Sequence, residues 1–212
     1  MKLYGYWRSS AAYRVRIALN LKNIECEHIS VHLVKDGGQQ HGEDYQAINP
    51  NELVPTLVDG AFKLNQSMAI LEYLEQKFPD IKLLPADLES QMTARAIAND
   101  IACDIHPLNN LRILQYLANE LDQDDAGKAK WYRHWVEVGF TSLEKTLTAT
   151  HGKFCVGDMV TWADICLIPQ VYNAERFNVG MAAFPIISSI AANCRALPAF
   201  ENASPENQAD AV

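Results

Sequence analysis

The chain has 212 residues, of which 49% are hydrophobic and 21% are charged, so it is long enough to bury a substantial core in one or two domains. Its formal net charge is -8 and it has no run of lysine or arginine, which disfavours nucleic acid and anionic membrane surfaces as partners. Neither a leader peptide nor an apolar run of membrane length is apparent, so we expect a cytoplasmic protein that does not enter a membrane.

Metal and disulfide chemistry are also disfavoured by the composition. The five cysteines are widely spread and form no Cys-x-x-Cys pair, which predicts reduced thiols that lie mostly in the core. The six histidines show no ligand-like spacing with cysteine or carboxylate, so we expect no metal site.

The first eighty residues alternate between strand and helix patterns. Lys2–Trp7 should be extended, Ser10–Leu21 should be helical with its arginines on the polar side, and Glu25–Val34 should be extended again. After a polar loop, the apolar runs Thr56–Val58 and Phe62–Leu64 should pair as a hairpin.

A helix closes this first half. Ser67–Phe78 carries apolar residues at helical spacing, and Pro79 ends the pattern. A parallel strand pair, a hairpin and a closing helix predict a thioredoxin-like α/β domain over residues 1–80, followed by a short linker over residues 81–88.

The second half contains no strand signals and predicts an all-α domain over residues 89–212. The expected helices are Glu89–Leu121, Lys128–Thr150, Trp162–Arg176 and Ile186–Leu197. Thr161 precedes Asp164 by three residues, a spacing typical of a capping box with a structural role. The last ten residues are small and polar, and we expect them to be frayed.

The junction Tyr6–Arg16 carries the most information about function. It places two adjacent hydroxyls, together with arginines, where the first strand gives way to the first helix. Free amide groups at a helix N-terminus attract anions, so this junction suits an anion or a thiolate. The alternative is that Ser9 or Ser10 only caps the helix, which position alone favours.

Residues 9–16, Ser-Ser-Ala-Ala-Tyr-Arg-Val-Arg, resemble the Ser-Ser-Cys-x-Trp-Arg-Val-Arg signature of zeta-class glutathione transferases. Matching segments at residues 36–40, 103–112 and 169–177 extend the resemblance over most of the chain. The resemblance implies a glutathione transferase fold, which consists of a thioredoxin-like α/β domain and an all-α domain. It also implies glutathione as cofactor and a homodimer.

The resemblance assigns the central chemistry to a hydroxyl. A free thiol has a pKa near 8.5, so little of it is thiolate at neutral pH unless a hydrogen-bond donor stabilises the anion. Ser9 or Ser10 would be that donor to the sulfur of glutathione. No histidine lies nearby in sequence to activate either serine as a nucleophile. Ala11 stands where the signature has cysteine and Tyr13 where it has tryptophan, which excludes any mechanism that uses that cysteine.

Further contacts to glutathione are implied by the same resemblance. The Val54-Pro55 bond would be cis and would turn the Val54 backbone toward the ligand, whereas the residues alone favour an ordinary trans turn. Gln66 and Ser67 would hold the γ-glutamyl carboxylate, a role compatible with capping, and Gln40 would contact the glycine end.

On the acceptor side, the resemblance implies that His106, Asn110 and Arg112 line the substrate site, at a spacing that places them roughly on one helical face. Arg8 and Arg176 would bind the substrate carboxylates as a clamp. The alternatives are a hydrogen-bonded structural histidine and a surface arginine that complements a helix C-terminus.

The implied activity is the glutathione-dependent cis–trans isomerisation of maleylacetoacetate to fumarylacetoacetate, a step of tyrosine and phenylalanine catabolism. The thiolate would add to the double bond, allow rotation and leave again. Maleylpyruvate is an alternative substrate, and conjugation of small α-halo acids is an alternative transferase reaction. A non-catalytic interaction module with the same fold is a further alternative, disfavoured because the site residues are present together.

Overall fold

The computed structural model describes residues 1–211 as two compact units. The first unit contains Met1–Leu83 together with the chain from Ala196 onward, and the second contains Leu84–Arg195. Contacts thus group the C-terminal segment with the N-terminal unit, whereas the sequence pattern suggested a second domain over residues 89–212.

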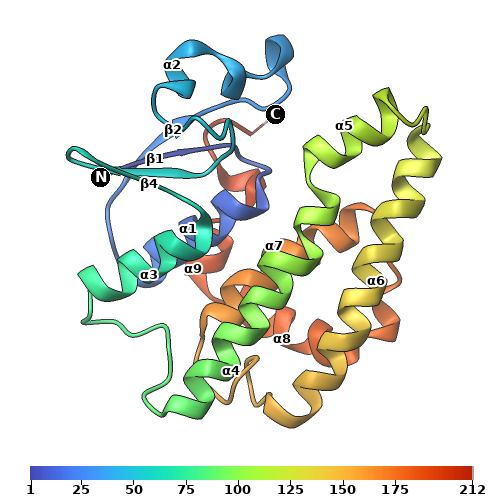
Figure 1. Ribbon diagram of the computed structural model, residues 1–212. Helices are drawn as coiled ribbons and strands as arrows, with labels where there is room; N and C mark the ends of the chain where they lie inside the picture. The colour runs from blue at the N-terminus through green and yellow to red at the C-terminus, as the bar shows by residue number, and fades with distance from the viewer. Residues whose placement is uncertain (212) are drawn as a thin grey trace. The chain divides into compact units, whose positions relative to one another are not determined.

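A four-stranded mixed sheet forms the centre of the first unit (Figure 1). Its strands are β1 (Lys2–Gly5), β2 (Glu27–Ser30), β3 (Thr56–Asp59) and β4 (Phe62–Asn65), arranged in the order β2-β1-β3-β4. β1 pairs with β2 in parallel, and β3 pairs antiparallel with both β1 and β4. The expected βαβ opening and the hairpin are therefore confirmed.

The first unit's helices are α1 (Ser10–Leu21), α2 (Glu43–Gln46), α3 (Ser67–Lys77) and α9 (Pro198–Glu201). The bounds of α1 agree with the prediction, and α3 ends one residue earlier than expected. Neither α2 nor α9 was predicted, because each spans only one helical turn and has no apolar period. α1 contacts both α3 and α9.

The expectation that the arginines of α1 lie on its polar side is wrong. Arg14 is 1% exposed and Arg16 is 4% exposed. Arg16 donates to the carbonyl oxygen of Ala203 at 3.0 Å and to that of Trp7 at 2.9 Å. The C-terminal segment covers this side of the helix, and local sequence gives no sign of a partner so distant in the chain.

The C-terminal tail is docked rather than frayed within its described part. The Asp210 carboxylate accepts hydrogen bonds from the Trp7 amide at 3.2 Å and from the Ser30 hydroxyl at 2.7 Å. Ala203 is 1% exposed. The tail therefore packs against the end of β2 and against the turn that leads into α1.

The second unit is all-α, as predicted (Figure 1). Its α-helices are α4 (Leu88–Asn99), α5 (Leu111–Asn119), α6 (Asp125–Thr150), α7 (Trp162–Arg176) and α8 (Pro185–Arg195). Almost all of α7 is buried, and it contacts α4 and α8. The predicted capping box is present: the Asp164 carboxylate accepts from the Thr161 amide at 2.8 Å, and the Thr161 hydroxyl accepts from the Ala163 amide at 3.3 Å.

The single helix expected over Glu89–Leu121 is wrong. After α4 the chain makes a π-helical turn at Asp100–Ile105 and a 3₁₀ turn at Pro107–Asn109 before α5 begins. Proline has no amide hydrogen to continue a helix, which explains the break at Pro107. Apolar residues recur at similar spacing on both sides of the break, so the periodic pattern conceals it.

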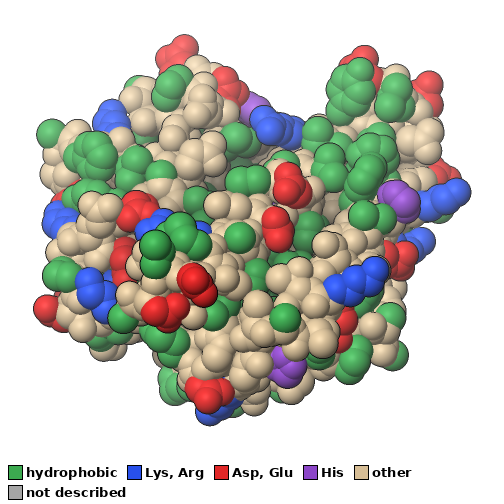
Figure 2. Space-filling model, turned by 60° about the horizontal axis from the view of Figure 1, so that its bottom comes forward, with side chains coloured by type: hydrophobic (Ala, Val, Ile, Leu, Met, Phe, Trp, Pro, Cys, Tyr) green, Lys and Arg blue, Asp and Glu red, His purple; other side chains and the backbone are tan. Residues whose placement is uncertain are grey.

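The surface agrees with the acidic composition. Figure 2 shows acidic and basic side chains interspersed over the face in view, with no extended basic patch. Among the described residues, no helix is both long and apolar enough to cross a membrane.

Candidate active site

Ser9 occupies the expected position at the start of α1. It is the N-cap residue, and its hydroxyl oxygen accepts a hydrogen bond from the Ala12 amide at 3.2 Å. The capping interpretation therefore holds for Ser9. An oxygen that accepts in this way keeps its own O–H for donation, so capping leaves Ser9 able to stabilise an anion. Ser10 is the first helical residue and is buried.

Arg8 lies in the turn immediately before this cap. Its side chain is half-buried, its guanidinium lies 4.5 Å from the centre of the Trp7 ring, and it donates to the Tyr6 hydroxyl at 3.3 Å. These contacts hold a charged planar group beside Ser9 in the chain. A guanidinium in this setting can bind a carboxylate bidentately.

The turn is supported from behind by residues that the sequence prediction did not include in the site. Burial lowers the pKa of Arg16 to about 10, so Arg16 remains cationic at neutral pH while it binds the carbonyl oxygens of Tyr6 and Trp7. A cavity of about 290 Å³ lies at this place and is lined in part by Trp7, Arg16 and Asp210. No local pattern could have identified Asp210, because its partner is 203 residues away in the chain.

Gln66 and Ser67 lie at the N-terminus of α3, as predicted. Gln66 is exposed and adopts a φ of 68°, whereas Ser67 is 5% exposed. The Ser67 hydroxyl accepts from Nη1 of Arg14 at 3.2 Å. The buried Arg14 therefore adds positive charge beneath free helical amides, which together form a setting suited to a carboxylate.

The other predicted glutathione contacts lie on two loops of the same unit. The Val54-Pro55 bond is cis, as the resemblance implied, and Val54 is half-buried. Gln40 is 5% exposed in a 3₁₀ turn at Gln39–His41. Only the resemblance singled out this glutamine, and its burial in the structure supplies an independent reason.

The predicted acceptor residues of the second unit do not share a helical face. His106 follows the π-helical turn, whereas Asn110 caps α5 and accepts from the Arg112 amide at 3.2 Å through its side-chain oxygen. The 3₁₀ turn between His106 and Asn110 breaks the helical spacing on which that expectation rested. The Arg112 side chain is exposed.

Arg176 lies in the last turn of α7, is exposed, and places its guanidinium 4.8 Å from the centre of the Phe177 ring. Phe177 in turn stacks on Tyr132 with ring centres 3.6 Å apart. Burial raises the pKa of Tyr132, so this phenol stays neutral and offers Arg176 no anionic partner.

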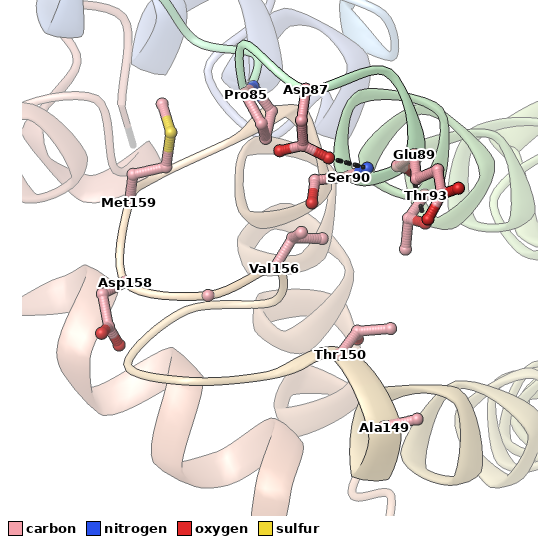
Figure 3. A pocket seen from close by; sticks show the side chains of 11 residues that line it. Pro85, Asp87, Glu89, Ser90, Thr93, Ala149, Thr150, Val156, Asp158 and Met159 are labelled. Carbon is pink, nitrogen blue, oxygen red and sulfur yellow. Dashed lines mark hydrogen bonds between the residues drawn. The ribbon is translucent and has the colours of Figure 1, made fainter.

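A large open cavity of the second unit contains none of the predicted site residues (Figure 3). Its volume is about 510 Å³ and Pro85, Thr93 and Met159 contribute to its lining. Polar groups there satisfy nearby backbone: Asp87 caps α4 by accepting from the Ser90 amide at 2.8 Å (Figure 3), and Asp158 accepts from the Lys153 amide at 2.8 Å. Size alone therefore does not identify the active site.

Four of the five cysteines are buried or half-buried, and Cys103 alone among the five is exposed. Cys155, Cys166 and Cys194 are buried, and burial raises the pKa of Cys155 and of Cys194. Burial also raises the pKa of Cys26 to about 11. Among residues 1–211, no group of three or more histidine, cysteine or acidic side chains could hold a metal ion.

Tyr13, which replaces the tryptophan of the signature, has a structural role. It is 4% exposed, and its hydroxyl donates to the Phe200 carbonyl at 3.4 Å, which links α1 to α9. Ala11 is half-buried and brings no reactive group to the junction.

Known proteins match the chain along almost its whole length. Residues 3–82 match the family "Glutathione S-transferase, N-terminal domain" and residues 110–201 match "Glutathione S-transferase, C-terminal domain". A probable maleylacetoacetate isomerase of Vibrio cholerae is 54% identical over 209 residues, which cover 99% of this chain and 97% of that protein. A maleylpyruvate isomerase of Ralstonia sp is 44% identical, with both chains covered completely. The crystal structure of maleylacetoacetate isomerase from Methylobacterium extorquens AM1, with bound malonate and GSH, matches with a TM-score of 0.96 and 40% identity over 100% of both chains.

Proposed function

Because the chain belongs to the glutathione S-transferase family, we propose that it is a glutathione-dependent isomerase that converts maleylacetoacetate to fumarylacetoacetate in tyrosine and phenylalanine catabolism. The observation that carries this proposal is the half-buried Ser9 hydroxyl at the N-terminus of α1, which caps the helix through its oxygen and keeps its proton for a thiolate. The 54% identity to the Vibrio cholerae relative supports the choice of substrate.

Ser9 would lower the pKa of the glutathione thiol. Its O–H and the partial positive charge of the α1 N-terminus both favour the anionic sulfur. Ser10 is the other candidate donor, and its burial beside Ser9 makes it the less accessible of the two. The nucleophile is then the sulfur of glutathione, since neither serine has a base beside it in the chain.

Four residues would hold the rest of the tripeptide. Gln66 and Ser67, with Arg14 beneath them, would bind the γ-glutamyl carboxylate at the N-terminus of α3. Val54 would pair with the backbone of the ligand, and Gln40 would contact its glycine end. A malonate- and GSH-bound relative supports a site that takes both a peptide thiol and a dicarboxylate.

The isomerisation needs only addition and elimination. The thiolate forms a C–S bond to one alkene carbon, and the electron pair of the double bond moves toward the conjugated carbonyl as an enolate. Rotation about the new single bond is followed by return of the pair, loss of the thiolate and release of the trans isomer. Glutathione is regenerated, so no other reactant is consumed.

The arginines would supply the electrostatic part of catalysis. Arg8 and Arg176 would bind the two carboxylates of the substrate and stabilise the enolate that forms on addition. His106, Asn110 and Arg112 would line the acceptor side. An acidic chain with a net charge of -8 needs such a local positive focus to attract a dianion.

Maleylpyruvate is the second candidate substrate, favoured by the complete coverage of the Ralstonia relative. Both substrates carry a cis-enedioic acid beside a ketone, so the same residues would serve either. Parallel assays of the two diacids with one enzyme preparation would give the ratio of their kcat/KM values, which decides between them.

We further propose that the protein acts as a homodimer in the cytoplasm. The five cysteines are all free thiols, which suits a reducing compartment rich in glutathione. Light scattering after gel filtration would test the dimer.

The first experiment follows conversion of maleylacetoacetate with and without glutathione while free thiol is counted. Turnover that requires glutathione and leaves its amount unchanged is the expected result. Consumption of thiol in proportion to product would instead indicate a conjugating transferase acting on substrates such as α-halo acids, and absence of glutathione binding would indicate a non-catalytic module.

Ser9→Ala and Ser10→Ala then assign the thiolate donor. We expect Ser9→Ala to raise the pKa of bound glutathione by about 1 to 2 units, because the thiolate loses a charge-assisted hydrogen bond. Ultraviolet absorbance of the thiolate against pH measures this value directly. The Ser10 variant is the matched control, and a larger shift there would exchange the two roles.

A further inference from the structure

We propose that His41 and Glu52 are positioning residues that orient the amide of Gln40 toward the glycine end of glutathione. The inference rests on the glutathione binding proposed above. It concerns residues that do not themselves touch the reacting atoms, and it arises from a chain of three side chains: Gln40, His41 and Glu52.

The Gln40 amide is buried and only partly satisfied. Its Nε2 donates to the Leu33 carbonyl oxygen at 3.3 Å and contacts Nε2 of His41 at 2.9 Å. Its Oε1 has no hydrogen-bond partner within the described part of the chain, although the residue is only 5% exposed. A buried amide oxygen without a donor is costly, so this atom is poised to accept from a ligand N–H, which the peptide bond to glycine supplies in glutathione.

The backbone at Gly38 is shaped to receive this amide. Gly38 adopts a φ of 103°, and a Cβ there would lie 2.5 Å from Nε2 and 2.7 Å from Oε1 of Gln40. Glycine therefore meets two requirements at once, a left-handed backbone and direct contact with the amide. This close packing limits the Gln40 amide to few orientations. The neighbouring side chain that contacts the amide therefore determines whether its oxygen or its nitrogen is left to contact the ligand.

The tautomer of the His41 ring determines the orientation of the Gln40 amide. Because the Gln40 N–H donates to it, Nε2 of His41 must carry a lone pair, and the ring proton then sits on Nδ1. Nδ1 faces a carboxylate oxygen of Glu52, which accepts this proton. Glu52 thus fixes the tautomer, and the tautomer fixes which atom of the Gln40 amide remains for glutathione.

The same pair joins the two loops that carry the glutathione contacts. His41 ends the Gln39–His41 turn, and Glu52 precedes Val54 by two residues. Gln46 holds the pair in place by donating to the Glu52 carboxylate at 3.2 Å and to the His41 carbonyl oxygen at 3.0 Å.

A purely structural contact between His41 and Glu52 would behave differently. The side chains of His41 and Glu52 are 53% and 35% exposed, and exposed pairs contribute little to stability. Removing either should therefore leave the fold intact, so that a change in glutathione affinity reports on orientation. A positioning role further predicts that the change depends on the glycine residue of the ligand.

The test measures binding by calorimetry for two ligands, glutathione and γ-glutamylcysteine, which lacks glycine. We expect His41→Ala to weaken glutathione binding about tenfold, the effect of one buried hydrogen bond, and to change γ-glutamylcysteine binding less than about twofold. Glu52→Gln should weaken glutathione binding less, because its amide oxygen still accepts from the ring. His41→Gln should recover most of the loss, since its amide can accept from Gln40 and donate to Glu52.

Glu43→Gln is the matched control, because Glu43 is an exposed glutamate on the adjacent helix α2. It should leave the affinity for both ligands unchanged. Equal weakening of both ligands by His41→Ala, or no weakening of either, would overturn the positioning role while leaving the proposed function intact. Failure of the unmodified protein to bind glutathione at all would overturn the proposed function and this inference together.

Discussion

Both units use carboxylates to satisfy backbone amides, as Glu75 and Asp210 do in the first unit, and the first unit also uses buried cations to satisfy backbone carbonyl oxygens. In the first unit, the cations of Arg16 and Lys22 donate to backbone carbonyl oxygens at distances from 2.6 to 3.4 Å. In the second unit, the carboxylates of Asp164 and Glu144 accept from backbone amides at distances from 2.7 to 3.0 Å.

The charged side chains that support the backbone lie away from the proposed site residues in the second unit and next to them in the first. Asp164 and Glu144 satisfy amides at or before the N-termini of α7 and α8, and neither is adjacent in sequence to a proposed site residue. Arg16, by contrast, binds the carbonyls of Tyr6 and Trp7 in the turn that leads to Ser9. We therefore expect substitutions of Asp164 or Glu144 to lower the stability alone. Substitutions of residues that contact the turn before Ser9 should also lower the affinity for glutathione.

The largest expected effect is in the second unit, at Asp164. This residue is fully buried and accepts from the amides of Cys155 and Thr161 at 2.8 Å each. Asp164→Ala leaves these donors unpaired and should cost about 3 to 5 kcal/mol of unfolding free energy. Asp164→Asn, which keeps one acceptor, should cost about half as much.

Urea unfolding monitored by circular dichroism gives both values. Asp158→Ala is the control, because the exposed Asp158 accepts from a single backbone amide, that of Lys153, at 2.8 Å. Its cost should be about 1 kcal/mol. A cost for Asp164→Ala no greater than that for Asp158→Ala would remove the buried carboxylate as an important stabilising element of the second unit.

The second largest effect is expected at Lys22 in the first unit. Its ammonium donates to the carbonyls of Phe78 and Ile81 and pairs with Glu75 at 2.8 Å, with both side chains buried. Lys22→Met leaves Glu75 without its cation and should cost about 3 kcal/mol. Lys2→Met, which breaks an exposed pair, should cost less than about 1 kcal/mol, and equal costs in urea unfolding would contradict the distinction.

The sequence predicted correctly those helices for which a capping residue and the spacing of apolar residues indicate the same bounds. The bounds of α1 and α7 were predicted correctly because Ser9 and Thr161 cap them and apolar residues follow at helical spacing. The break around Pro107 was missed because apolar spacing continues past it.

The candidate site shows the same division between local and distant signals. Ser9 and Ser67 could be identified from their positions at helix starts. Arg16 was assigned to a polar face because the segment that covers it, including Ala203, lies 187 residues further along the chain. Asp210 gave no signal at all, since a single aspartate in a polar tail has no pattern. Only folding reveals that these groups support the turn before Ser9.

Asp210 tests whether the tail matters for the junction. Asp210→Ala removes the acceptor of the Trp7 amide and of the Ser30 hydroxyl. We expect glutathione affinity to fall about fivefold, equivalent to about 1 kcal/mol, because the turn before Ser9 loses one of its supports. Calorimetry measures this, with Glu206→Ala as a second carboxylate variant of the same tail. An unchanged affinity would show that the Asp210 carboxylate is not needed to hold the turn.

The smallest effect is a pH dependence of stability at His28, near the same cavity. Partial burial lowers the pKa of His28, Arg16 lowers it further, and Asp210 opposes them. The folded protein therefore binds a proton at His28 less readily than the unfolded chain, so stability should fall as the pH drops below about 6.5, the ordinary value for histidine. His28→Gln should reduce the pH dependence of the urea unfolding midpoint between pH 5 and 7. Asp210→Asn should increase this pH dependence, because the carboxylate that favours the protonated His28 ring is then lost. Identical slopes in the unmodified protein and in both variants would exclude His28 as the titrating group.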